Sequence, residues 1–115
     1  MARERPQSLL VLGDPLFFER RSQLAELAAK ARLPAIYAQP QHAEAGGLMS
    51  YGSDVADVFR RAAYYADKIL KGTKPTDLPV EQPTKIDFVI NLKAANALGI
   101  TIPQHVLQRA DRVIE

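Results

Sequence analysis

A few polar side chains stand where the sequence predicts that strands end, and these are the residues whose types and spacing could do chemistry. Asp14 follows an apolar run (8–12) and Gly13, while Ser50 and Tyr51 follow a shorter apolar pair flanked by glycines. In open α/β sheets, ligands bind in the crevice outside the carboxyl ends of the strands. A carboxylate there can bind an ammonium or hydroxyl group, and a tyrosine can stack on a ligand and orient it. These positions therefore predict a small-molecule binding site.

Each candidate also has a purely structural interpretation, and both interpretations stay open at this point. Asp14 precedes Pro15, so it is also a good helix N-cap, and the two roles can coexist. Phe17 and Phe18 lie 100° apart on a helix and must divide between the core and the crevice; we assign Phe17 to the crevice. Tyr51 is either a core aromatic residue or a pocket wall. The predicted ligand-binding residues are Asp14, Phe17, Ser50 and Tyr51.

The residues needed for catalysis or metal binding are few. His42 lies in a polar stretch (39–45), where we expect a loop or at most a short helical turn with a solvated histidine. His105 lies in the first turn of an expected surface helix. The chain has no cysteine and no further ligands at metal-binding spacing, so we expect no metal and no cofactor. Gly46-Gly47 lacks the spacing and the lysine of a phosphate loop, and no serine has nucleophile-elbow flanks. The sequence predicts that this protein is not an enzyme.

Composition restricts the partners. The net charge of +2 comes from basic residues spread along the chain with acids nearby, which argues against nucleic-acid binding. The first residues, MARERPQS, lack the apolar core of a signal peptide, so we expect no export signal in the chain as written. No stretch approaches the length of a membrane span.

The elements that must position these residues follow an α/β pattern. The run 8–12 predicts a strand buried on both faces, a helix is expected from Asp14 to the residues before Pro34, and 34–38 predicts a second strand. This β-α-β unit implies parallel strands and a right-handed crossover. A brief strand over Leu48 and Met49 then leads to Ser50 and Tyr51. The predicted fold class is therefore α/β, a parallel sheet with flanking helices.

The second half contains the clearest helix of the chain, over 53–71, with Ser53 as its expected cap and Gly72 after it. Its apolar residues form one stripe: Val55, Val58, Phe59, Ala62, Ala66, Ile69 and Leu70. A connector (73–84) with three prolines should be extended. A strand over 86–90, a short helix capped by Asn91, and a last helix running from Pro103 to Ile114 complete the prediction.

Three segments together carry a family resemblance: AGGLMSYG, DKILKGTKPTDLPVEQPT and VINLKAANALGITIP. From about Ser8 onward, the chain resembles the carboxyl-terminal part of ABC transporter substrate-binding proteins. That family has a type I periplasmic-binding-protein fold and includes tryptophan- and tyrosine-type amino-acid binders. The resemblance implies a non-enzymatic transport component that binds a small organic solute between two lobes and delivers it to an ABC transporter permease.

The resemblance also implies how the chain is organised. Residues 1–52 would form the end of the second lobe (strand, helix, strand, loop, strand), and residues 53–115 a crossover helix, a Pro-rich connector, a strand and C-terminal helices returning toward the first lobe. A ligand-facing acid is implied at Asp14, with ligand or hinge contacts around Ser50-Tyr51-Gly52. The implied location is extracytoplasmic, either periplasmic or membrane-anchored.

Complete members of that family are much longer, so the chain resembles a truncated copy with part of the cleft missing. The apolar stripe of the 53–71 helix would then lack the sheet it packs on. We expect the helix either to fold back onto the chain's own strands or to be buried in a homodimer. The alternative function is a ligand-free α/β interaction or scaffold domain that dimerises through this helix.

Overall fold

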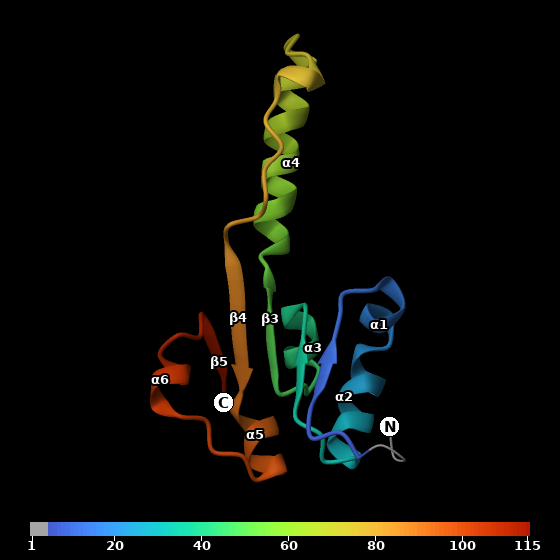
Figure 1. The fold of residues 1–115 in the computed structure, drawn as a ribbon, viewed down its shortest axis with the longest axis vertical. Coiled ribbons are helices and arrows are strands. Elements are labelled where there is room, and N and C mark those ends of the chain that lie inside the picture. The colour runs from blue at the N-terminus through green and yellow to red at the C-terminus, as the bar shows by residue number, and fades with distance from the viewer. Residues whose placement is uncertain (1–4) are drawn as a thin grey trace. The chain divides into compact units, whose positions relative to one another are not determined.

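The computed structural model describes residues 5–115, and within them a five-stranded sheet has the order β1-β2-β3-β4-β5 (Figure 1). The strands are β1 (Leu9–Val11), β2 (Ala35–Tyr37), β3 (Met49–Ser53), β4 (Ile86–Asn91) and β5 (Arg112–Ile114). The helices are α1 (Pro15–Glu19), α2 (Arg21–Lys30), α3 (Pro40–Glu44), α4 (Val55–Leu70), α5 (Leu92–Leu98) and α6 (Gln104–Leu107), with a 3-10 turn, η1, over Pro75–Asp77. The predicted α/β class with flanking helices is confirmed.

The sheet is mostly parallel. β1 pairs with β2, β2 with β3, and β4 with β5, all in parallel. Between β3 and β4, the Asn91 N–H donates to the Leu48 carbonyl and the Asp54 N–H donates to the Lys85 carbonyl. One residue number rises as the other falls, so this pair is antiparallel, as the opposed arrows in Figure 1 show. The all-parallel expectation is corrected at this one junction.

The chain divides into two compact units. Unit 1 comprises 1–52 together with Asp87–Glu115, and unit 2 comprises Ser53–Ile86. Residues 87–115 thus pack with 1–52, whereas the sequence analysis grouped them with the crossover helix. The assignment of 1–52 and 53–115 to lobes of a larger protein stays a prediction.

The core of unit 1 lies on the face of the sheet that carries Val11 and Tyr37. Both pack with Ala28 and Ala35, and Leu9 and Leu24 lie against this cluster. The predicted burial of the first strand on both faces is wrong, because the core cluster covers only the face that carries Leu9 and Val11. Leu10 and Leu12 are 65% and 67% exposed.

Two predicted helices are also corrected. The helix expected from Pro15 onward is broken at Arg20, which has φ −97° and ψ 21°, so that α1 is a single turn. The last expected helix ends at Leu107 and is followed by β5. The backbone and side chain of Asp111 both bond the backbone of Phe88, at 2.8 Å each, and this pairing to β4 replaces further helix.

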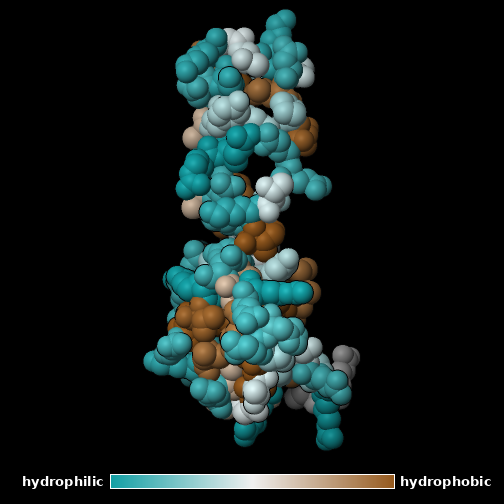
Figure 2. Space-filling view, turned by 90° about the vertical axis from the view of Figure 1, so that its left-hand side faces the viewer, coloured by the Kyte–Doolittle hydropathy of each residue, from teal (hydrophilic) through white to brown (hydrophobic). Residues whose placement is uncertain are grey.

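In unit 2, α4 begins after Asp54, whose carboxylate accepts from the Asp57 N–H at 3.1 Å. Asp54 therefore takes the capping role predicted for Ser53. No residue of α4 is buried; Phe59 is 71% and Leu70 87% exposed. Hydrophobic side chains accordingly appear at the molecular surface in Figure 2. Within residues 5–115, no helix is both long enough and apolar enough to cross a membrane.

Candidate functional site

The carboxyl ends of β1, β2 and β3 meet at one edge of the sheet. We call this edge, at Ala38 and Gly52, the rim. Val11 is in register with Tyr37, and Tyr37 with Ser50. Just beyond, a Cβ added to Gly52 would lie 2.1 Å from the Ala38 carbonyl oxygen. Adjacent strands lie about 4.8 Å apart, so β1 and β3 are separated by about 10 Å, the scale of a small organic molecule.

Asp14 follows β1 at this rim. Its extended backbone (φ −154°, ψ 139°) caps α1, and Oδ1 accepts from the Leu16 N–H at 2.8 Å. The side chain is exposed. A carboxylate has about four acceptor positions, so one capping bond leaves capacity for a ligand. The predicted cap is confirmed, and the ligand role stays a prediction.

Phe17 lies on α1 and is 38% exposed. Phe18, the next residue, is half-buried, and its ring lies edge-on to the His42 ring with centroids 6.3 Å apart. Neither phenylalanine is buried, so the expected division between core and crevice stays a prediction. The contact of Phe17 with a solute also stays a prediction.

Ser50 and Tyr51 point to opposite faces of β3, as successive residues of a strand must. Ser50 is fully buried on the Tyr37 side, whereas Tyr51 is 56% exposed. The Tyr51 ring lies edge-to-face with Phe88, with centroids 5.7 Å apart and an interplanar angle of 74°. Of this pair, the structure offers only Tyr51 to a molecule arriving from solvent.

His42 is the functional candidate that the sequence analysis placed wrongly. It lies on α3, which is the short helical turn left open for this stretch, but it is 2% exposed rather than solvated. Its ring stacks on Tyr37 with centroids 5.0 Å apart and an interplanar angle of 17°, and its Nε2 lies 3.2 Å from the Phe17 carbonyl oxygen. Pro40 at the first helical position, after Gln39, was the available signal for α3.

A buried polar layer surrounds His42. The hydroxyls of Tyr37 and Ser50 and the Nδ1 of His42 are buried without a hydrogen-bond partner among the described residues. Burial raises the pKa of the Tyr37 hydroxyl. Asn91 is better satisfied: its Nδ2 donates to the Ala43 carbonyl at 2.9 Å, and its Oδ1 accepts from the Ala94 N–H at 3.1 Å. Across residues 5–115, no group of three or more His, Cys, Asp or Glu side chains could hold a metal ion.

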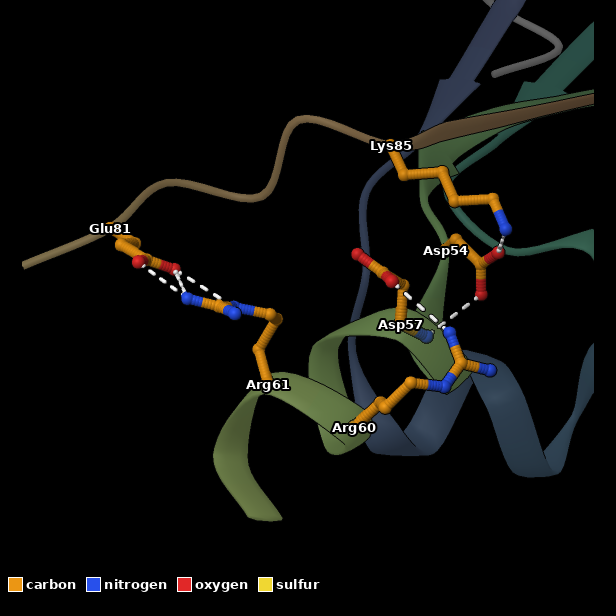
Figure 3. A network of polar contacts seen from close by, with 6 residues as sticks. All are labelled: Asp54, Asp57, Arg60, Arg61, Glu81 and Lys85. Carbon is orange, nitrogen blue, oxygen red and sulfur yellow. Dashed lines mark hydrogen bonds and ion pairs between the residues drawn. The ribbon is translucent and has the colours of Figure 1, made fainter. Parts of the chain in front are cut away.

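Unit 2 carries a separate groove of about 810 Å³ between α4 and the connector. Arg61 and Glu81 form a bidentate ion pair across it, at 2.6–3.0 Å (Figure 3). This contact lowers the pKa of the Glu81 carboxyl and raises that of Arg61. The Tyr65 hydroxyl donates to the Pro79 carbonyl at 2.6 Å. These contacts tie the connector to α4, and none of the predicted ligand-binding residues lines the groove.

Unit 2 contains a second ion pair, between the residue that caps α4 and the residue that follows the connector. Lys85 Nζ lies 3.1 Å from Asp54 Oδ2 (Figure 3). The Asp57 N–H and then Lys85 lower the pKa of the Asp54 carboxyl. Asp54 therefore both caps α4 and holds the end of the connector.

A comparison with known protein families identifies the family of this chain. The profile described as "ABC transporter substrate binding protein" matches residues 1–114. The chain belongs to this family. A search of curated proteins gives no match.

Three solved structures share the fold. A conserved domain protein from Vibrio cholerae O1 biovar El Tor is 33% identical with a TM-score of 0.88; the match covers 96% of this chain and 37% of that one. The ABC domain in complex with L-Trp from Streptococcus pneumoniae is 30% identical with a TM-score of 0.88, covering 98% and 38%. A ligand-free, open substrate-binding protein with adhesive properties from Clostridium difficile is 25% identical with a TM-score of 0.65, covering 93% and 36%.

This chain therefore spans between 36% and 38% of the length of these three relatives. The family resemblance and the predicted fold are confirmed. The four predicted contact residues are not tested by these comparisons.

Proposed function

We propose that this protein is the solute-binding component of an ABC-type uptake transporter and holds a small organic solute at the rim beyond β1 and β3. The family membership carries the proposal. It is supported by the exposed Asp14 carboxylate, which follows β1, and by the exposed Tyr51 ring. Tyr51 lies within β3 rather than after it, because this strand continues to Ser53 and is longer than the sequence predicted.

Amino acids are the first solute class to test. A relative of 30% identity was solved with L-Trp, and Asp14 supplies an acceptor for an ammonium group while Tyr51 supplies an aromatic face. The role is non-enzymatic, with an ABC permease as partner and an extracytoplasmic location, either periplasmic or membrane-anchored. Residues 1–52 end the second lobe and residues 53–115 lead back toward the first, and the solute lies between the two lobes.

A thermal-shift screen with the amino acids and with small organic solutes tests the proposal. A solute that binds only the folded protein stabilises it by an amount that grows with the logarithm of the ratio of free solute to Kd, and so raises its unfolding temperature. We expect one amino-acid class to give a concentration-dependent rise. A flat response across the panel would remove the proposed ligand class.

One observation favours a second function, a ligand-free interaction domain that dimerises through α4. No residue of this 16-residue helix is buried, although Val55, Phe59 and Leu70 follow one apolar stripe. Burial of such a stripe between two copies would stabilise a symmetric dimer.

Sedimentation velocity tests this alternative. If α4 mediates a dimer, Phe59→Glu dissociates it, whereas Arg60→Gln, which changes the net charge equally on the polar face, does not. A compact monomer at all concentrations would eliminate the dimer. In that case, the solute-binding proposal stands alone.

A further inference from the structure

We infer that His42 is a positioning residue: it holds the α1 turn, which carries Asp14 at its cap and Phe17 within it, in the conformation that receives the solute. This inference rests on the proposed function for its consequence, but its structural part can be tested without any solute. His42 itself is 2% exposed and does not face the rim.

The α1 turn cannot define its own position. It has five residues and no buried side chain, and Leu16 and Phe17 are 58% and 38% exposed. A single helical turn is unstable alone, because nucleation costs more than its few hydrogen bonds return. Its last carbonyl groups also lack partners within the helix. External contacts must therefore fix it.

Two side chains supply those contacts. Arg21, the first residue of α2, donates to the Phe18 carbonyl at 2.9 Å, and this contact is local because only three residues separate the two. His42 Nε2 lies 3.2 Å from the Phe17 carbonyl, and 25 residues separate the two in sequence. A carbonyl oxygen only accepts, so this contact assigns a proton to Nε2, which donates to it.

His42 is itself held from several sides. Its ring stacks on Tyr37 of β2. Its carbonyl accepts from the Gly47 N–H at 2.9 Å, and the neighbouring Ala43 carbonyl accepts from Asn91 of β4. A residue that orients a binding group must be locked by its own surroundings, and His42 meets this requirement. The contacts form a continuous path from β2 and β4 through α3 to α1.

Two variants separate the donor from the ring. His42→Phe keeps an aromatic ring for Tyr37 but removes the N–H that reaches the Phe17 carbonyl. His42→Gln loses the ring but keeps an amide N–H at the end of the side chain. His105→Phe, the same substitution at an exposed histidine of α6, is the matched control.

Amide hydrogen exchange followed by NMR is the first measurement. The Phe18 and Arg20 N–H groups bond the Asp14 and Leu16 carbonyls within the turn, at 3.0 Å each. In His42→Phe we expect these two amides to exchange about two- to tenfold faster, the factor that corresponds to one net hydrogen bond. The α2 amides should stay unchanged, and His42→Gln should lie closer to wild type. Unchanged exchange in α1, or an equal increase throughout unit 1, would overturn the inference.

Titration with L-tryptophan as the probe is the second measurement. If wild type binds it, His42→Phe should weaken the affinity about two- to tenfold, with His42→Gln between the two and His105→Phe like wild type. Equal affinity in His42→Phe and wild type would contradict the positioning role. If wild type binds no amino acid, the proposed solute class fails, and the exchange measurement still decides whether His42 holds α1.

Discussion

At the scale of single residues, the rim depends on the close approach between Gly52 and the end of β2. A Cβ at position 52 would stand 2.1 Å from the Ala38 carbonyl oxygen, and this contact is with backbone, which cannot rotate away. The absence of a side chain at Gly52 is therefore a packing requirement at this position.

Gly52→Ala should lower the free energy of unfolding by about 1–3 kcal/mol, because β2 and β3 must separate to admit the methyl group. Gly13→Ala is the matched control, since its Cβ would meet the Ala38 Cβ at an ordinary 3.7 Å. Urea unfolding of both variants provides the comparison. Equal stabilities would show that the strands do not approach so closely.

Asn91 has two roles that one substitution can separate. Asn91→Ala removes the α5 cap and leaves the Ala43 carbonyl without its buried donor, so we expect a loss of about 1–3 kcal/mol in unfolding free energy. Asn91→Ser keeps a capping oxygen and should recover part of that loss. Chemical denaturation measures both, and an alanine variant as stable as wild type would show that neither bond matters.

The sequence predicts the role of a single residue where that role depends on neighbours along the chain. The Asp14 cap follows from Asp-Pro alone, because the bond it makes is two residues away. His42 was placed wrongly because its burial arises from contacts with Tyr37 and Phe17, which only the folded sheet brings together. Likewise, the contrast between buried Ser50 and exposed Tyr51 depends on which face of β3 the helices cover.

At the scale of elements, the Arg61–Glu81 pair joins α4 to the connector (Figure 3). The Tyr65 hydroxyl adds a hydrogen bond to the Pro79 carbonyl. The folded state lowers the pKa of Glu81, chiefly through the hydrogen bonds from Arg61. A lowered pKa means that the contribution of this pair is present above the ordinary glutamate value of 4.5 and is lost as the pH falls through the lower, folded value.

We therefore expect the Arg61 Nε–H resonance to titrate with a midpoint below pH 4.5, because this N–H donates to Glu81. In Glu81→Gln the transition should disappear. Glu26→Gln, which removes an exposed ion pair with Lys30 in unit 1, is the control and should leave it unchanged. A midpoint at or above 4.5 would contradict the pairing.

Some elements are determined by neighbouring residues in the sequence, and others by contacts with distant parts of the chain. The continuous stripe of α4 and the β-α-β order of β1, α2 and β2 could be predicted, because both depend on local periodicity and punctuation. The last segment could not: its apolar residues fit a helix, but Asp111 pairs with Phe88 and the chain continues as β5. The antiparallel β3–β4 junction likewise depends on how the α4 excursion returns.

At the scale of the whole molecule, the chain is an α/β member of the ABC substrate-binding family that spans 36–38% of its solved relatives. The proposed solute site is accordingly one wall of a cleft. Asp14 and Tyr51 are its exposed polar and aromatic groups. By our inference, His42 holds the α1 turn that Asp14 caps.

Calorimetric titration with L-tryptophan and the other amino acids tests whether the protein binds an amino acid through Asp14 and Tyr51. We expect saturable heat for at least one amino acid. The affinity should be about tenfold or more weaker in Asp14→Asn, because a charged acceptor is lost, and unchanged in Glu26→Gln. Absence of heat with every amino acid, or binding that Asp14→Asn and Tyr51→Ala leave unaltered, would contradict this proposal.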